Sequence, residues 1–231
     1  MRKRIIVFGL AFFAYFIILA LPVKSQQTLA VLDFDNNSIF DRERFEPLRK
    51  GLAQMFTSEL SKVAALRLVE RADLQRVVEE MKLAQAGMVD AATAQQVGKL
   101  VGAQNLLLGG FVALGGGKMR IDVRIVTVET GRTVKAEEKS GKENQLFEMV
   151  SALNRKLIRD LADKISSKDE AALGELSNVK FSAMLLFSQG VAAEDKGNLA
   201  LAREKYRAAL KEDDGFDAAR ARLAAIEKVK K

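Results

Sequence analysis

The chain has 231 residues and contains neither cysteine nor histidine, and its 37 lysine and arginine residues outnumber its 30 acidic residues by seven. The lack of cysteine excludes disulfides, thiolate catalysis, cysteine-containing metal sites and lipid attachment to a mature N-terminal cysteine. The remaining general bases and nucleophiles are carboxylates, Ser, Thr, Lys and Tyr, and no Ser lies in a G-x-S-x-G setting. We therefore predict that the protein is not an enzyme.

The N-terminus has the layout of a secretory signal peptide over residues 1–25. Basic residues precede an unbroken apolar run from Ile5 to Leu21, and small residues follow it. This layout predicts cleavage between Ser25 and Gln26, and the alternative is a retained membrane anchor. Cleavage leaves 33 basic and 30 acidic residues, a near balance that gives no reason to expect a nucleic-acid partner.

The first elements predicted after this leader are a strand, a helix and a second strand. Leu29–Asp35 is apolar and ends in polar residues, as a buried strand does. A helix is predicted from about Arg44 to Val63, because apolar residues recur there at helical spacing. Leu66–Val69 is a short apolar segment of the β type.

Residues that cap or stop helices mark nearly every joint in the next region. Asp73 is expected to cap a helix that Gly87 stops, and Asp90 to cap a second helix that Gly102 ends. A strand at Asn105–Gly110 follows. The two helices are predicted from apolar residues at helical spacing: Leu74, Val77, Val78 and Met81 in the first, and Ala94, Val97 and Val101 in the second.

A hairpin and a long helix complete this part of the chain. Apolar and polar residues alternate from Met119 to Ile125, which predicts a strand with one solvated face. The Thr130–Gly131 turn leads to Thr133–Glu138 as the partner strand, and a helix is expected from Asn144 to Ile165. We expect an α/β domain over residues 28–166, with a mixed sheet covered by helices.

Three blocks of this domain resemble the CsgG-type family of bacterial envelope proteins, and the resemblance covers roughly residues 28–166. The blocks are the strand LAVLDF, the strand-to-helix junction VERADL and the helix-to-strand junction GKLVGAQNLLLG. The residues that match the family pattern are Asp33, Phe34, Glu70, Arg71, Leu74, Glu80, Gly98, Gly102, Ala103 and Gly109. The resemblance implies a CsgG-like fold and an exported protein of the periplasm, with association with the outer membrane as an alternative.

The resemblance also implies a mode of action. It implies an assembly or accessory factor in secretion or cell-envelope machinery, with protein partners in the periplasm or outer membrane and self-association into a homo-oligomer. The alternative is a subunit of an oligomeric outer-membrane secretion channel related to the curli transporter. Membrane β-strands need about ten alternating residues with aromatic girdles, whereas Tyr206 is the single tyrosine after the leader and tryptophan is absent. CsgG-type transporters are usually lipoproteins, so the lack of cysteine departs from the family.

The C-terminal part predicts a linker and a helical hairpin. Residues 167–177 are polar and contain glycine, and residues 178–231 resemble one tetratricopeptide repeat. In that alignment Gly190, Ala202 and Ala209 are the small residues of a tight helix crossing, and Tyr206 fills the gap between the helices. One repeat cannot bury its apolar face alone, so it is either a separate unit that docks on a partner or on another copy, or it packs on the first domain.

Asp33, Asp35 and Asn37 have the opening spacing of a calcium-binding loop. Ser38 and Arg44 stand where such a loop needs glycine and an acidic residue. Capping of the end of the strand is therefore the favoured interpretation, and no metal is expected.

The segment Gly115–Lys118 resembles part of a phosphate-binding loop. Val112 and Met119 stand where that motif needs glycine and a hydroxyl residue, so a hairpin loop is favoured. We expect no cofactor and identify no small-molecule substrate.

Overall fold

The structure is a computed structural model that describes residues 26–81, 91–161, 173 and 179–228. The predicted signal peptide lies outside these residues. So do the expected helix boundaries at Gly87 and Asp90, and nearly all of the predicted linker.

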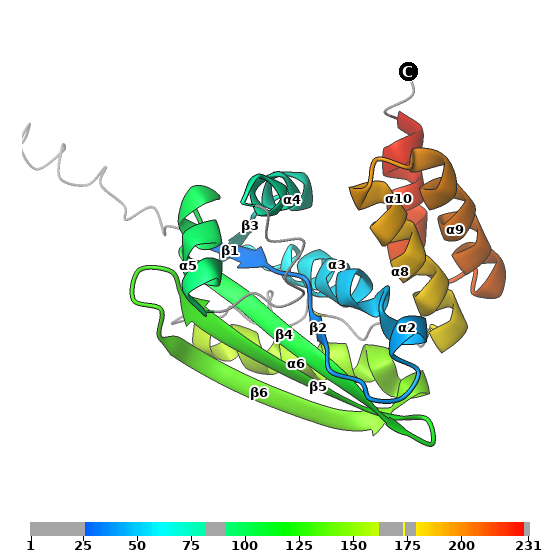
Figure 1. Ribbon diagram of the computed structural model, residues 1–231, viewed down its shortest axis with the longest axis horizontal. Coiled ribbons are helices and arrows are strands. Elements are labelled where there is room, and N and C mark those ends of the chain that lie inside the picture. The colour runs from blue at the N-terminus through cyan, green and yellow to red at the C-terminus, as the bar shows by residue number, and fades with distance from the viewer. Residues whose placement is uncertain (1–25, 82–90, 162–172, 174–178, 229–231) are drawn as a thin grey trace, which may run out of the picture.

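A mixed β-sheet forms the centre of the molecule (Figure 1). The strand order is β3 (Leu66–Leu68), β1 (Gln27–Val31), β4 (Asn105–Gly115), β5 (Lys118–Thr127) and β6 (Thr133–Lys142). β1 runs parallel to β3 and β4, whereas β4, β5 and β6 are antiparallel neighbours. The short strand β2 (Asp35–Asn36) pairs in parallel with β4. The predicted mixed sheet is therefore confirmed.

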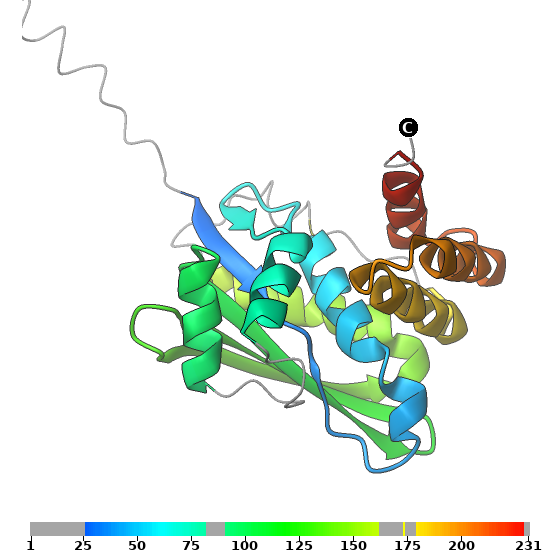
Figure 2. The same ribbon diagram turned by 45° about the horizontal axis from the view of Figure 1, so that its top comes forward.

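The described helices cover the two faces of the sheet unequally (Figure 2). On one face, α3 (Leu48–Leu60) and α6 (Leu146–Leu161), which follows the 3₁₀ turn η2 (Glu143–Gln145), share the main core with strands β1, β4 and β5. On the other face, α5 (Ala91–Leu100) packs on a smaller apolar cluster, and α4 (Arg71–Glu80) packs on α5.

Two predicted helix boundaries were wrong. The helix expected over Arg44–Val63 is two helices, α2 (Arg42–Phe45) and α3, because Pro47 stands between them and has no N–H to continue the first. Asp73 does not cap α4. Glu70 is the N-cap residue, and Asp73 lies in the first turn, where its negative charge is favourable.

Three helices, α8 (Phe181–Asp195), α9 (Leu199–Glu212) and α10 (Asp217–Lys228), form the C-terminal part. α8 packs directly on α3, and both contribute to one continuous apolar core. The contact is close at Gly51, where an added Cβ would lie 1.9 Å from Ser188 Oγ. The structure therefore favours the second alternative for this segment, in which it packs on the first domain.

The residues predicted to form the tight helix crossing do lie together. An added Cβ on Gly190 of α8 would lie 2.5 Å from the ring of Tyr206 on α9. Tyr206, Ala202 and Ala209 are fully buried, and the Tyr206 hydroxyl donates a hydrogen bond to Glu194, 2.6 Å away. The tetratricopeptide assignment itself stays a prediction.

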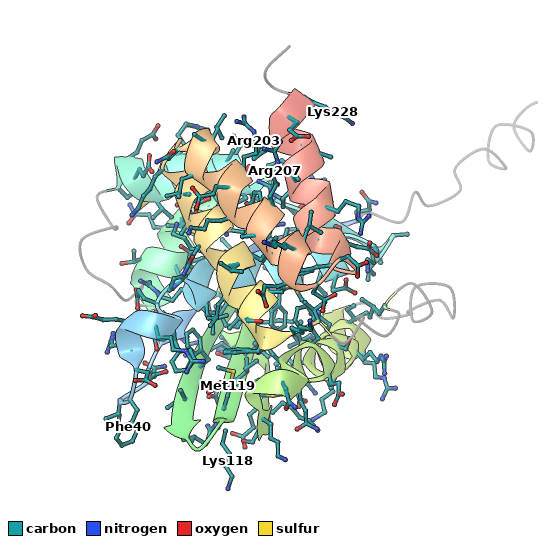
Figure 3. The ribbon with its side chains drawn as sticks, turned by 90° about the vertical axis from the view of Figure 1, so that its right-hand side faces the viewer. Phe40, Lys118, Met119, Arg203, Arg207 and Lys228 are labelled. Atoms are coloured by element: carbon teal, nitrogen blue, oxygen red, sulfur yellow. The ribbon has the colours of Figure 1, made fainter. Side chains whose placement is uncertain are left out.

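One end of the molecule carries apolar side chains on its surface. Ile39, Phe40 and Leu114 are 84%, 63% and 53% exposed. Ile39 and Phe40 lie in the loop after β2 and Leu114 lies near the end of β4. The two segments are neighbours, since Ser38 Oγ accepts a hydrogen bond of 2.9 Å from the Ala113 N–H. We call these three residues the apolar tip, and Figure 3 shows Phe40 at the end of the molecule opposite Lys228. No helix among the described residues is long and apolar enough to span a bilayer.

Candidate functional site

Four charged side chains from distant parts of the sequence meet beside the carboxyl end of β1. Arg71 donates hydrogen bonds to Asp33 (2.9 Å) and, through two nitrogens, to Asp195 (3.0 and 2.7 Å). Lys50 forms salt bridges with Asp195 and, at 3.3 Å, with Asp33. We call these four residues the ion-pair cluster. Two cations face two anions in it, so its charge is balanced.

Each member of the ion-pair cluster is positioned by the end or the inner face of an element. Asp33 follows β1, and Arg71 is the first residue of α4, where the extended backbone of Glu70 begins the helix. Lys50 lies on α3 and Asp195 is the last residue of α8. The side chains of Arg71 and Asp195 are only 10% and 8% exposed.

Burial and neighbouring charges shift the pKa values of this cluster in opposite directions. Burial acts to raise the pKa of Asp33, but attraction and hydrogen bonding from Arg71 and Lys50 outweigh it, so the pKa lies below its usual value. Burial likewise acts to lower the pKa of Arg71, and its two carboxylate partners raise it instead. Both groups are therefore held in their charged forms, which suits a structural tie and not a proton-transfer site.

The structure brings two pairs of family-motif residues together. Asp33 and Arg71 meet in the ion-pair cluster. Phe34 packs over Gly109 of β4, where an added Cβ would lie 2.3 Å from the ring. The Phe34 ring also contacts Phe56 of α3, at 5.1 Å between centroids. Glycine at position 109 thus leaves the space that the buried ring needs.

The other motif residues occupy separate structural positions and do not converge on one site. An added Cβ on Gly98 would lie 2.6 Å from Val128, so α5 approaches the sheet closely there. Gly102 has a φ of +67° just after α5, a conformation that glycine adopts without strain. Ala103 and Leu74 are buried, whereas Glu70 and Glu80 are exposed.

The part of the sheet that α5 leaves open carries a groove of about 520 Å³. β2 and the residues beside it form one side of the groove, and β4, β5 and β6 form its floor and other side. The polar and small side chains that matter for its chemistry are Asp35, Gly110, Asp122, Arg124, Ala136 and Glu138. Alternation along the strands places them on the face away from α6.

Most charges in the groove are already engaged. Asp122 accepts a 2.6 Å salt bridge from Arg120, and Glu138 accepts one of 3.0 Å from the same guanidinium. Asp35 and Arg124 differ, because neither side chain forms a hydrogen bond or salt bridge with another residue in the described part of the chain. Burial raises the pKa of Asp35, and Arg49 and Arg124 lower it too weakly to compensate.

The groove was not anticipated from the sequence. Alternation over residues 119–125 predicted that Arg124 faces solvent, but Asp35 comes over the sheet only because β2 pairs with Gly110 and Phe111 of β4. No group of three or more acidic residues in the described ranges is arranged to hold a metal ion.

The fold is that of a mixed-sheet α/β protein whose open site consists of charged and small side chains. Over residues 14–177 the chain matches the family model described as "Curli production assembly/transport component CsgG", and it belongs to this CsgG family. No curated protein matched the chain by sequence.

Solved structures show more distant similarity. The LpoB C-terminal domain from Salmonella enterica is 19% identical with a TM-score of 0.39, covering 55% of this chain and 91% of that one. Lipoprotein GNA1162 from Neisseria meningitidis is 19% identical with a TM-score of 0.39, and the match covers 58% of this chain and 99% of that one. The PelC dodecamer from Paraburkholderia phytofirmans is 12% identical with a TM-score of 0.29, and the match covers 66% of this chain and 87% of that one.

Proposed function

We propose that this CsgG-family protein is exported and acts in the bacterial cell envelope as a non-enzymatic assembly or accessory factor. It works through contacts with other proteins in secretion or cell-envelope machinery. The observation that carries the proposal is the family match over residues 14–177, because the family is named for a component of curli assembly and transport.

The chemistry of the charged sites supports contact in preference to catalysis. In the ion-pair cluster the charges neutralise one another, and in the groove Arg120 holds two of the carboxylates. A shallow surface with fixed charges suits recognition of another protein. In this proposal the C-terminal helices belong to the same body as the sheet, since α8 shares its core.

Export is tested by fractionation and N-terminal sequencing. The protein recovered from the periplasmic fraction should begin at Gln26, and a Ser25→Phe variant should keep its leader, because signal peptidase requires a small residue there. Recovery of the wild-type chain with an intact Met1 in washed membranes would show an anchored protein. Recovery in the cytoplasm would refute export.

The accessory role is tested by affinity capture from the periplasm with the tagged mature protein. Reproducible capture of subunits of one envelope or secretion complex, together with loss of that assembly when the chain is deleted, supports the proposal. Normal assembly in the deletion strain under every growth condition tried would contradict it.

A further inference from the structure

The open part of the sheet is a surface that the rest of the described chain leaves uncovered. α5 packs over the end of the sheet near Val126 and Val128, and α6 lies on the opposite face (Figures 1 and 2). Between α5 and the far ends of β4, β5 and β6, the 520 Å³ groove opens to solvent. Its floor includes Ala136, whose small side chain leaves room above β6, whereas the Asn37 side chain lies over Gly110.

Two opposite charges in this groove have no close polar contact with another described side chain. Asp35 and Arg124 flank β4 from opposite sides, because Asp35 pairs with Gly110 and Arg124 pairs with Leu108. Neither forms a hydrogen bond or salt bridge with another described residue, although Arg120, Asp122 and Glu138 beside them are fully engaged. A partly buried carboxylate without a donor is costly, and a bound cation removes that cost.

We propose that this groove binds an extended segment of a partner protein that presents a basic side chain to Asp35 and an acidic side chain to Arg124. In an extended segment, side chains at positions i and i+2 lie on one face, roughly 7 Å apart. One face can therefore supply both charges, while the small side chain of Ala136 leaves room for the backbone of the segment. This inference rests on the proposed function and adds the chemistry of the partner.

The segment must carry both a basic and an acidic side chain, which makes the proposal specific. A purely basic segment would be attracted by Asp35 but repelled by Arg124. A purely acidic segment would be attracted by Arg124 but repelled by Asp35. Like charges placed opposite each other suppress binding, so the pair selects for segments that carry both signs.

A phage-displayed library of random dodecapeptides, selected on the immobilised full-length protein, tests the idea without a known partner. Affinities of the enriched peptides are then measured by fluorescence polarisation. We expect peptides with a basic and an acidic residue two positions apart, whose affinity falls about tenfold in Asp35→Asn and in Arg124→Gln. The controls are Asp217→Asn on α10 and Arg76→Gln on α4, at side chains that are 93% and 63% exposed. They should bind like the wild type.

A reversed groove gives a sharper test. The double variant Asp35→Arg/Arg124→Asp should lose the original peptides and bind peptides in which the basic and acidic residues are exchanged. Peptides that bind both groove variants as tightly as the wild type, or a library with no enrichment, would overturn the proposal. Complete displacement by millimolar lysyl-glutamate dipeptide would also overturn it, since it would identify a small-molecule site.

Failure of this inference is separable from failure of the proposed function. If Asp35→Asn and Arg124→Gln capture the same periplasmic complex as the wild type, the groove is not the docking site but the accessory role stands. If the wild type captures no complex and its deletion has no effect, the proposed function itself fails.

Discussion

Arg71 connects three parts of the chain that are far apart in sequence. Its guanidinium bonds to Asp33 after β1 and to Asp195 at the end of α8, and it is almost completely shielded from solvent. A planar guanidinium can serve two carboxylates at once, which a lysine ammonium at the same place cannot match in geometry. The arginine of the VERADL block, Arg71, therefore joins the end of β1 to the end of α8 through its two carboxylate partners.

Replacement of Arg71 by Met should strongly destabilise the fold. It leaves the buried carboxylate of Asp195 and the partly buried one of Asp33 with Lys50 as their remaining cation among the cluster residues, and the loss should be about 3 kcal/mol or more. Urea denaturation of the purified protein measures it. Arg76→Met on the same helix, at a side chain 63% exposed, is the matched control and should change stability by less than about 0.5 kcal/mol. Equal losses in the two variants would contradict the role given to Arg71.

Asp33 and Asp35 should respond to acid in opposite directions. The folded-state pKa of Asp33 is lowered, so its stabilising contribution is complete at neutral pH and is lost as the pH falls through that pKa. The folded-state pKa of Asp35 is raised, so its charged form costs stability at neutral pH, and the cost disappears as the pH falls through the raised value.

Free energies of unfolding between about pH 7 and pH 3 should show both effects. Asp33→Asn should be less stable than the wild type at neutral pH, and the difference should shrink on acidification. Asp35→Asn should be at least as stable as the wild type at neutral pH, with a gain that also shrinks in acid. A loss of stability in Asp35→Asn at neutral pH would show that this carboxylate has a partner in the fold.

At the scale of elements, small residues decide how closely the C-terminal helices pack. Gly51 brings α3 against Ser188 of α8, and Gly190 brings α8 against Tyr206 of α9. α8 therefore contacts a neighbour on two sides and belongs to the main core. A substitution that removes packing on one side of α8 should therefore also loosen the packing on its other side.

Tyr206→Ala should create a cavity costing about 3 kcal/mol or more, because the ring is fully buried and packs on Phe187. Tyr206→Phe keeps the ring and removes only the hydrogen bond to Glu194, so it should cost about 1 kcal/mol. Hydrogen exchange locates the effect. Since α8 shares the core, Tyr206→Ala should reduce protection in α3 as well. Protection lost only after residue 177 would restore the separate docking unit.

At the scale of the whole molecule, the apolar tip is an exposed apolar surface suited to self-association. Its three side chains are more than half exposed, and Figure 3 shows Phe40 at one end of the molecule. We expect light scattering to show a concentration-dependent oligomer at micromolar concentrations, and Phe40→Asp to shift it to monomer. Leu201→Asp, at a leucine 38% exposed on α9, is the control. A wild-type monomer across a wide dilution range would contradict the prediction.

Elements with clear periodicity were predictable, and long-range pairings were not. The alternation over residues 119–125 correctly gave β5, and the Thr130–Gly131 turn correctly gave the hairpin to β6. The break at Pro47 was missed because the apolar stripe continues through it. Asp33 was assigned to strand capping, and no local signal links it to Asp195 through Arg71. The groove likewise depends on the pairing of β2 with β4.

The position of Asp195 near the C-terminus has a consequence for how the chain matures. Because a protein chain is synthesised from its N-terminus, Asp33, Lys50 and Arg71 are made well before α8. Until then two cations share one carboxylate, and the apolar surface of α3 that α8 covers is open to water. A product that ends before residue 195 should therefore leave this apolar surface exposed and be cleaved by proteases more readily than the whole chain. Both the ion-pair cluster and the main core are therefore complete only once α8 has been made.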